Sequence, residues 1–241
     1  MNIPDPNLRL LFASRPSSTD VDLNLAARYA PALKLDTREP FLPRAVAYRI
    51  FRKSAASPSF PRKIDLNTAE KPSPELAIEY AIWWDWDIIH LYDLEHIWLF
   101  LDQSGQIVRA EASWHGDCKD MSVGGGLQLS RERLTLFSEP GKHAFAPMAA
   151  VLQDEAESTR QLCGQMAGIG GLLITPLFNK ITSLKTPEVD RLIYTFLQSR
   201  AFEPTFEFSR SFSISAEMLV PWPALYRWIP ARLAWLIDNL K

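Results

Sequence analysis

The stretch from residue 76 to residue 115 carries three segments that favour β-strands, with no room for a helix between them. These segments, LAIEYAIWWDWD, EHIWLFLD and QIVRAEASWHG, are rich in the aromatic and β-branched residues that pack well on a pleated sheet. The sequence QSGQ, residues 103–106, separates the second segment from the third and is typical of a hairpin turn. Parallel strands would need long crossover connections, so this spacing predicts an antiparallel sheet.

The rest of the chain adds strands to this sheet and helices around it. Further strand-like runs are AVAYRIFRK before it, and LTLFS and PTFEFSRSFSI after it. A helix is predicted from Pro187, with Thr186 as its N-cap, and a shorter one from Asp20. The tail from Pro221 has an amphipathic helical pattern that is interrupted near Pro230. We therefore predict a mainly β fold, an antiparallel β-sandwich with peripheral helices, including C-terminal helices.

The expected domain organisation follows from these elements. Residues 1–28 are predicted to form a leader with a short helical segment. Residues 29–241 are predicted to form one β-sandwich domain with helical additions after about residue 150. We expect the tail helix to pack against the sandwich rather than to lie on a membrane surface.

Composition and charge limit the function. The formal net charge of −2 implies no broad basic face, so nucleic acid is not an expected partner. The two cysteines do not make a disulfide framework and are expected to be reduced thiols. The N-terminus lacks the pattern of a signal peptide, and the longest apolar run, from Met166, is too short to be a transmembrane segment. A cytoplasmic protein is therefore expected.

Charged residues are concentrated in the most aromatic part of the chain. Asp85, Asp87, His90 and Asp93 lie within residues 79–96, together with three tryptophans. Burying an unpaired carboxylate costs several kcal/mol, and neighbouring carboxylates raise one another's pKa. Some group must compensate for this charge, and a bound cation is the leading candidate.

The histidines point to the same end of the sheet. All four histidines of the chain fall within a 54-residue window. A hairpin that turns at Ser104-Gly105 places Glu95 opposite residues 113–115, beside His115. A compact site is therefore predicted from His90, Asp93, Glu95 and His115. Carboxylates with one or two imidazoles suit magnesium, calcium, manganese or zinc.

Other interpretations of these residues stay open. The same side chains could form a hydrogen-bonded structural network at a strand end. Only one of Asp85 and Asp87, which share a strand face, is expected to be a ligand. His96 should face away from Glu95 and have a core or supporting role, whereas His143 is either a pocket residue or a turn residue.

The third strand supplies candidates for a ligand pocket beside the cation. Its alternation places Glu111, Ser113 and His115 on one face. Ser113 and His115 lie two residues apart without a nucleophile-elbow context, so a serine hydrolase is not expected.

Several short motifs resemble a known group of proteins. The pattern H-x-x-D-x-E-H at residues 90–96, followed by S-x-H-G at residues 113–116, is similar to the core of the necrosis-inducing protein superfamily, which carries G-H-R-H-D-W-E. It resembles even more the vacuolar protein sorting sixty-two family, which reads H-x-G-D-W-E-H and later S-x-H. GKHA at residues 141–144 and YAPALKLDTREPFLP resemble further segments of that family, so the likeness covers roughly residues 29–147.

The resemblance implies a β-sandwich with a divalent cation at one edge, magnesium or calcium being favoured over manganese or zinc. The ligands it implies are His90, Asp93 and Glu95 with either Asp85 or Asp87, and His115 acting through a water molecule. The chain departs from the pattern at Leu94, where the family has tryptophan.

Two classes of function follow. The first is a binding protein whose cation holds a polar ligand such as a sugar or lipid headgroup. The alternative is a metal-dependent hydrolase, in which the cation activates water and His115 or His143 moves the proton. No motif specifies a reaction, so the sequence favours binding.

Overall fold

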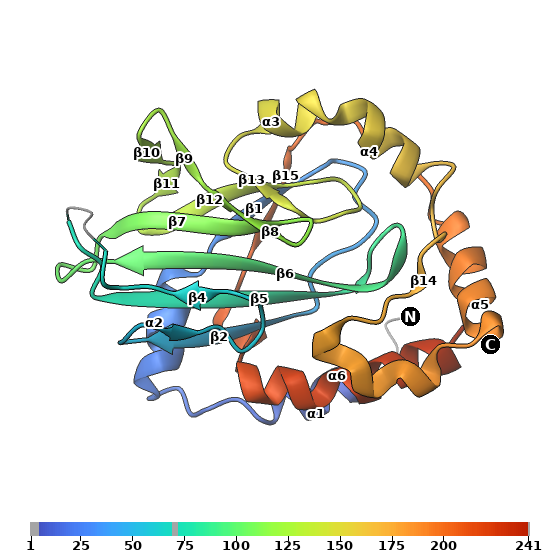
Figure 1. Ribbon diagram of the computed structural model, residues 1–241, viewed down its shortest axis with the longest axis horizontal. Helices are drawn as coiled ribbons and strands as arrows, with labels where there is room; N and C mark the ends of the chain where they lie inside the picture. The colour runs from blue at the N-terminus through green and yellow to red at the C-terminus, as the bar shows by residue number, and fades with distance from the viewer. Residues whose placement is uncertain (1–4, 69–71, 241) are drawn as a thin grey trace.

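The computed structural model describes residues 5–68 and 72–240 and places two β-sheets at the centre of the molecule, with helices at the periphery (Figure 1). The larger sheet has seven strands in the order β16-β2-β5-β6-β7-β8, with β14 also paired to β6. These strands are β2 (Ala45–Phe51), β5 (Leu76–Trp86), β6 (His90–Leu101), β7 (Ile107–Trp114), β8 (Asp117–Asp120), β14 (Gly171–Leu172) and β16 (Leu219–Pro221).

The smaller sheet has five strands and is built from segments far apart in the sequence. It runs β11-β12-β1-β15, with β13 also paired to β12. Its strands are β1 (Ala32–Leu35), β11 (Leu129–Ser130), β12 (Arg133–Ser138), β13 (Phe145–Ala146) and β15 (Arg210–Ser213). Two short hairpins complete the β structure: β3 (Ala55–Ala56) with β4 (Lys63–Ile64), and β9 (Ser122–Val123) with β10 (Gly126–Leu127).

The predicted mainly β fold is confirmed, but the sheets are mixed rather than purely antiparallel. The predicted hairpin pairings β5–β6 and β6–β7 are antiparallel. Three pairings between distant segments are parallel, namely β1–β12, β14–β6 and β16–β2. Local sequence patterns contain no signal for these pairings because each joins segments more than 70 residues apart.

The two faces of the β5–β6 ribbon have different coverings. On one face, Tyr80 donates a hydrogen bond from its hydroxyl to the Ala26 carbonyl at 2.8 Å, and Trp84 packs near Phe145 of β13. This face builds the main core with the smaller sheet. On the other face, Trp83 contacts Trp228 edge-to-face.

That second face also carries a smaller core under the β3–β4 hairpin. Its fully or nearly fully buried members are Phe51, Ile64, Leu66, Ala77, Trp98 and Phe100. The β5–β6 ribbon is thus buried on both sides, which explains why its sequence is apolar at almost every position.

Helices flank the sheets (Figure 1). They are α1 (Pro6–Phe12), α2 (Val21–Tyr29), α3 (Ala149–Asp154), α4 (Ala156–Cys163), α5 (Pro187–Gln198) and α6 (Trp222–Asp238), with 3₁₀ segments η1 (Pro176–Leu184) and η2 (Ala216–Met218). The predicted N-cap of α5 is confirmed, because the Thr186 side chain accepts a hydrogen bond from the Val189 N–H at 3.2 Å. Among the described residues, no helix has the length and apolar character needed to cross a bilayer. Cys118 and Cys163 are both free thiols.

Two predicted elements differ from the structure. Helix α6 continues through Pro230 instead of ending there, because Trp228, Ile229 and Leu233 on either side of it are buried and hold both halves in place. The strand predicted from Pro204 is limited to β15. The Asp36 carboxylate accepts the Phe206 N–H at 2.6 Å, so this part of the backbone is bonded to a side chain instead of a neighbouring strand.

Candidate metal and ligand site

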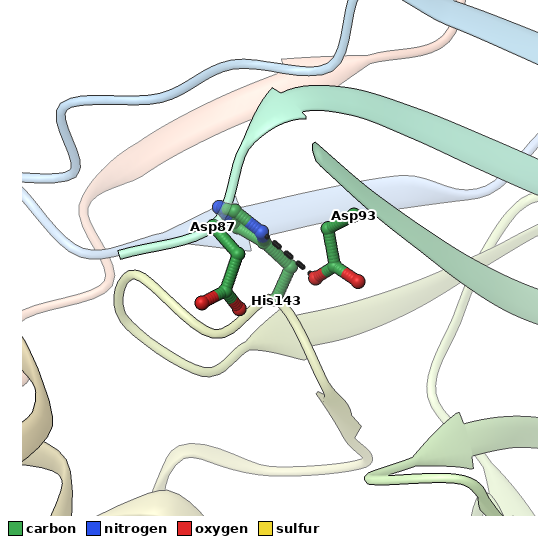
Figure 2. A group of neighbouring side chains, drawn as sticks. All are labelled: Asp87, Asp93 and His143. Atoms are coloured by element: carbon green, nitrogen blue, oxygen red, sulfur yellow. Dashed lines mark hydrogen bonds and ion pairs between the residues drawn. The ribbon is translucent and has the colours of Figure 1, made fainter. Parts of the chain in front are cut away.

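Three side chains that can ligate a cation meet at one end of the sandwich. Asp87, Asp93 and His143 each offer a ligand atom, and these atoms lie within 4.8 Å of one another (Figure 2). Asp87 follows the end of β5, Asp93 lies near the start of β6, and His143 lies in the turn between β12 and β13. The β5–β6 turn brings Asp87 and Asp93 together, and the β12–β13 turn, distant in sequence, adds His143.

Local backbone interactions fix these positions. Asp87 accepts the Ile89 N–H on its carboxylate at 2.6 Å, which closes the turn between β5 and β6. In the β12–β13 turn, Gly141 has φ +69°, and a Cβ atom there would come within 3.0 Å of Ile88 and Cys163. Glycine is therefore needed at the position that brings His143 to the cluster.

His143 is fully buried between acidic groups. Its Nδ1 lies 3.1 Å from Asp93 Oδ2, its Nε2 lies 3.6 Å from Glu39 Oε1, and its ring stacks on Trp84 with centroids 4.5 Å apart. Burial alone would lower the pKa of His143, but the bonds to Asp93 and Glu39 raise it to about 10. His143 is therefore an imidazolium at neutral pH.

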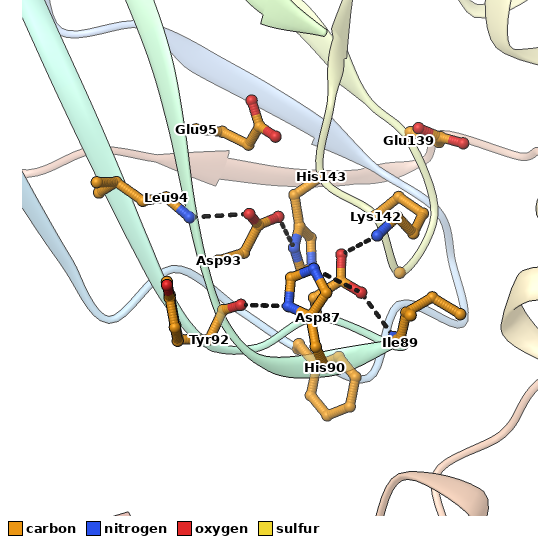
Figure 3. Close-up of polar contacts among 12 residues, drawn as sticks. Asp87, Ile89, His90, Tyr92, Asp93, Leu94, Glu95, Glu139, Lys142 and His143 are labelled. Atoms are coloured by element: carbon orange, nitrogen blue, oxygen red, sulfur yellow. Dashed lines mark hydrogen bonds and ion pairs between the residues drawn. The ribbon is translucent and has the colours of Figure 1, made fainter. Parts of the chain in front are cut away.

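Lys142 supplies a second positive charge (Figure 3). Its Nζ lies 2.6 Å from Asp87 Oδ2, and only 13% of its side chain is exposed. Burial opposes the charged form of Lys142, yet the charges of Asp87 and Asp93 leave its pKa raised. Burial likewise opposes the Asp87 carboxylate, but His90, Lys142 and His143 together hold its pKa below the usual value.

Two positively charged side chains balance the charge of the clustered acids. Lys142 and His143 compensate for the carboxylates of Asp87 and Asp93. A metal ion bound to all three ligands would have to displace the Lys142 ammonium and the proton on His143.

Of the other predicted ligands, His90 and Glu95 border the group without joining it. His90 donates from Nδ1 to the Tyr92 carbonyl at 2.8 Å, and its Nε2 is 3.9 Å from Asp87 Oδ1. Glu95 is buried and accepts a hydrogen bond from the Ser113 hydroxyl. Burial, with the neighbouring charge of Asp93, raises the pKa of Glu95 well above its usual range.

The structure places Asp85 away from the group, against helix α6. Arg232 Nε lies 2.9 Å from Asp85 Oδ1, and Arg232 Nη2 lies 2.6 Å from Asp85 Oδ2. Asp85 and Asp87 would share a face only in a continuous strand. Strand β5 ends at Trp86, and the chain then turns, so the two carboxylates separate.

The predicted pocket residues of the third strand are also separated. Glu111 pairs with Arg62, Ser113 bonds to Glu95, and His115 Nε2 lies 2.9 Å from Glu139 Oε2. The bond to Glu139 raises the pKa of His115, whose side chain is 43% exposed. His115 has φ +50°, so it lies in the turn after β7 rather than in register with the other two.

Comparisons with known proteins found similarity to solved structures only. No protein-family model and no characterised protein matches this chain by sequence. Solved structures similar to part of it include NLPPya in complex with glucosamine, at 18% identity over 55% of this chain and 69% of that chain, with a TM-score of 0.38. Necrosis and Ethylene inducing Protein 2 from the causal agent of cocoa's Witches Broom disease is similar at 18% identity over 54% and 68% of the two chains, with a TM-score of 0.34.

A further similar structure is described as a toxin fold for microbial attack and plant defense, with 18% identity, 60% and 83% coverage and a TM-score of 0.34. These structural neighbours are toxin-fold proteins of the necrosis-inducing type. The comparisons lend no support to the resemblance to the vacuolar protein sorting sixty-two family.

Sequence reasoning missed three charged residues of this region: Glu39, Glu139 and Lys142. Lys142 stands beside His143 in the GKHA segment, so its position was visible but its pairing was not. Glu39 accepts the Gly141 N–H at 2.7 Å across 102 residues of sequence, which no local pattern reveals.

His96 has the core role predicted for it. It is fully buried, its ring stacks on Trp98 with centroids 5.5 Å apart, and its Nε2 lies 3.0 Å from Ser59 Oγ. Burial lowers the pKa of His96 to about 3, the charge of Arg62 adds to this effect, and the Leu94 carbonyl opposes it.

This neutral, buried imidazole should make the protein sensitive to acid. An unfolded histidine has a pKa of about 6.5, so between pH 6.5 and 3 the unfolded chain binds a proton that the folded chain excludes. The contribution of neutral His96 to the free energy of unfolding is therefore fully present above pH 6.5. It is lost as the pH falls, by about 2–3 kcal/mol at pH 4.5. Urea unfolding at pH 7 and pH 4.5 measures this loss. A His96→Gln variant should lose less over the same interval, and equal losses would contradict the assignment.

Proposed function

We propose that the protein binds a divalent cation through Asp87, Asp93 and His143, and that the cation holds a small polar ligand such as a sugar or lipid headgroup. The observation that carries this proposal is the convergence of three ligand atoms within 4.8 Å. The two carboxylates suit magnesium, calcium or manganese, whereas the imidazole suits zinc.

Lys142 acts as the competitor of the cation in this proposal. Its ammonium group neutralises Asp87 when no metal is bound. Because the lysine stem is long and flexible and its side chain is 13% exposed, the ammonium can move towards solvent when a metal ion enters. Binding a divalent cation then displaces both the Lys142 ammonium and the proton on His143.

A Lys142→Met variant is therefore expected to bind the cation about tenfold more tightly, which corresponds to the loss of one competing ion pair of about 1.4 kcal/mol. An Asp93→Ala variant should not bind it. Titration calorimetry with magnesium, calcium, manganese and zinc measures both effects. Lys180→Met is the matched control, because Lys180 is exposed in η1 and its removal changes the net charge equally. Absence of binding in both the parent and Lys142→Met would leave only a structural network.

The alternative, a metal-dependent hydrolase, is favoured by one observation. His115 is 43% exposed beside Glu139, so it can exchange protons with solvent, whereas His143 is fully buried. Phosphoester, ester and glycoside substrates assayed with each metal separate the two functions. Turnover that requires added metal and is lost in His115→Asn would support the hydrolase. Metal-dependent retention on glycan or lipid arrays without turnover would support the binding protein.

A further inference from the structure

His143 presents a different carboxylate to each of its two ring nitrogens. Nδ1 lies 3.1 Å from Asp93 Oδ2 (Figure 2), and Nε2 lies 3.6 Å from Glu39 Oε1. Asp93 belongs to the proposed cation site, whereas Glu39 lies outside that group of three ligands. The side chains of His143 and Glu39 are 0% and 1% exposed, so neither faces solvent. The two nitrogens can therefore have different roles.

The imidazole ring cannot turn over without losing both contacts. It stacks on buried Trp84 with an angle of 10° between the ring planes, which fixes its plane. A rotation of 180° about the Cβ–Cγ bond would keep this plane but would put carbon atoms where Nδ1 and Nε2 now face carboxylates. That exchange is unfavourable, because two buried acids would lose a charged partner.

The Glu39 carboxylate is held in place independently of His143. Its Oε1 accepts the Phe41 N–H at 3.1 Å, and its Oε2 accepts the Gly141 N–H at 2.7 Å. Gly141 lies in the β12–β13 turn, two residues before His143. Two backbone donors thus fix the carboxylate that faces Nε2, and one of them comes from the turn that carries the imidazole.

The distances favour Nδ1 as the atom that would ligate a cation. Two ligand atoms about 2.1 Å from one ion and about 90–110° apart lie about 3.0–3.4 Å from each other. The 3.1 Å separation of Nδ1 and Asp93 Oδ2 lies in this range. Nδ1 would have to give up its hydrogen, whereas Nε2 would keep its own and face Glu39. A histidine ligand commonly donates its other ring N–H to a carboxylate, which fixes its tautomer.

We propose that Glu39 is the positioning residue of the cation site. It holds the hydrogen of His143 on Nε2 and so leaves Nδ1 free to ligate. This role rests on the proposed function, because it requires a cation at Nδ1.

Nitrogen NMR of the histidine rings tests this role in the unaltered protein. Zinc is the probe, because it is diamagnetic and binds imidazole. The chain has four histidines, and through-bond correlation with its own backbone amide identifies the ring of His143. With zinc we expect the Nδ1 resonance to shift and Nε2 to keep its directly bonded hydrogen. A hydrogen on Nδ1 instead would overturn the role of Glu39 but not the cation site. A His143 spectrum that zinc leaves unchanged would overturn both.

Two variants with the same change in charge separate positioning from local charge. In Glu39→Gln the amide oxygen still accepts one backbone N–H, but no negative charge faces Nε2. Titration calorimetry should show zinc affinity about tenfold lower or less. Glu139→Gln is the matched control, because Glu139 is also buried here but its carboxylate contacts His115, so the loss of affinity should be clearly smaller. Equal zinc affinity in the two variants would overturn the positioning role.

Discussion

Replacing Arg232 with methionine is expected to lower the free energy of unfolding by about 3–5 kcal/mol. Arg232 is 2% exposed and makes two hydrogen bonds to the Asp85 carboxylate, at 2.9 Å and 2.6 Å, and a further contact of 2.6 Å to Asp5. Asp85 is itself 7% exposed. Without the guanidinium, the Asp85 carboxylate stays buried with too little positive charge beside it. An uncompensated buried charge of this kind destabilises the folded state strongly.

Urea unfolding of three variants tests this expectation. The double variant Arg232→Met with Asp85→Leu removes both charges and should recover much of the loss, because no charge is then left buried. Arg28→Met breaks a pair with Glu132 whose side chains are 55% and 50% exposed, so the unfolding midpoint should change little. If Arg232→Met changes the unfolding midpoint as little as Arg28→Met does, the Arg232–Asp85 ion pair does not contribute the expected stability.

The central ribbon of the fold could be predicted because its signals are local. Strands β5, β6 and β7 contain most of the three segments recognised by their aromatic and β-branched content, although β6 begins at His90, before the second segment. The turn at residues 103–106 joins the last two strands. A hairpin register follows from the turn between its strands, so the convergence of the strand ends could also be foreseen.

The composition of the site could be predicted only in part. Asp87 and Asp93 meet as expected, because the β5–β6 turn lies between them. Asp85 does not, because its partner Arg232 lies 147 residues away and could not be read from the segment itself. The pairing of Lys142 with Asp87 could not be predicted either, because a sequence shows the sign of a charge but not which group lies beside it in the fold.

The parallel pairings and the position of Glu39 were out of reach for the same reason. The β1–β12 pairing joins strands about a hundred residues apart, and Glu39 contacts Gly141 across 102 residues of sequence. Such arrangements are decided by tertiary packing, and the hydrophobic periodicity of a single segment contains no information about its distant partner.

Replacing Trp84 with alanine is the second change with a large expected effect, a loss of about 3–5 kcal/mol. Trp84 is fully buried between the sheets, and its ring is nearly parallel to that of His143, with an angle of 10° and centroids 4.5 Å apart. Alanine would leave a cavity in the main core. It would also remove the aromatic face that contacts the buried imidazolium, a contact that favours the charged ring.

Trp84→Phe separates these two contributions. Phenylalanine keeps an aromatic face for His143 and fills part of the volume, so its loss should be clearly smaller than that of alanine. Trp86→Ala is the control for loss of a tryptophan from the same strand, because Trp86 is only partly buried and contacts Phe196 on a helix instead of the site. Unfolding should be followed by far-UV circular dichroism, since the substitutions themselves change the tryptophan fluorescence. If Trp84→Ala loses no more than Trp86→Ala, the stacked pair does not anchor the end of the sandwich where Asp93 and His143 meet.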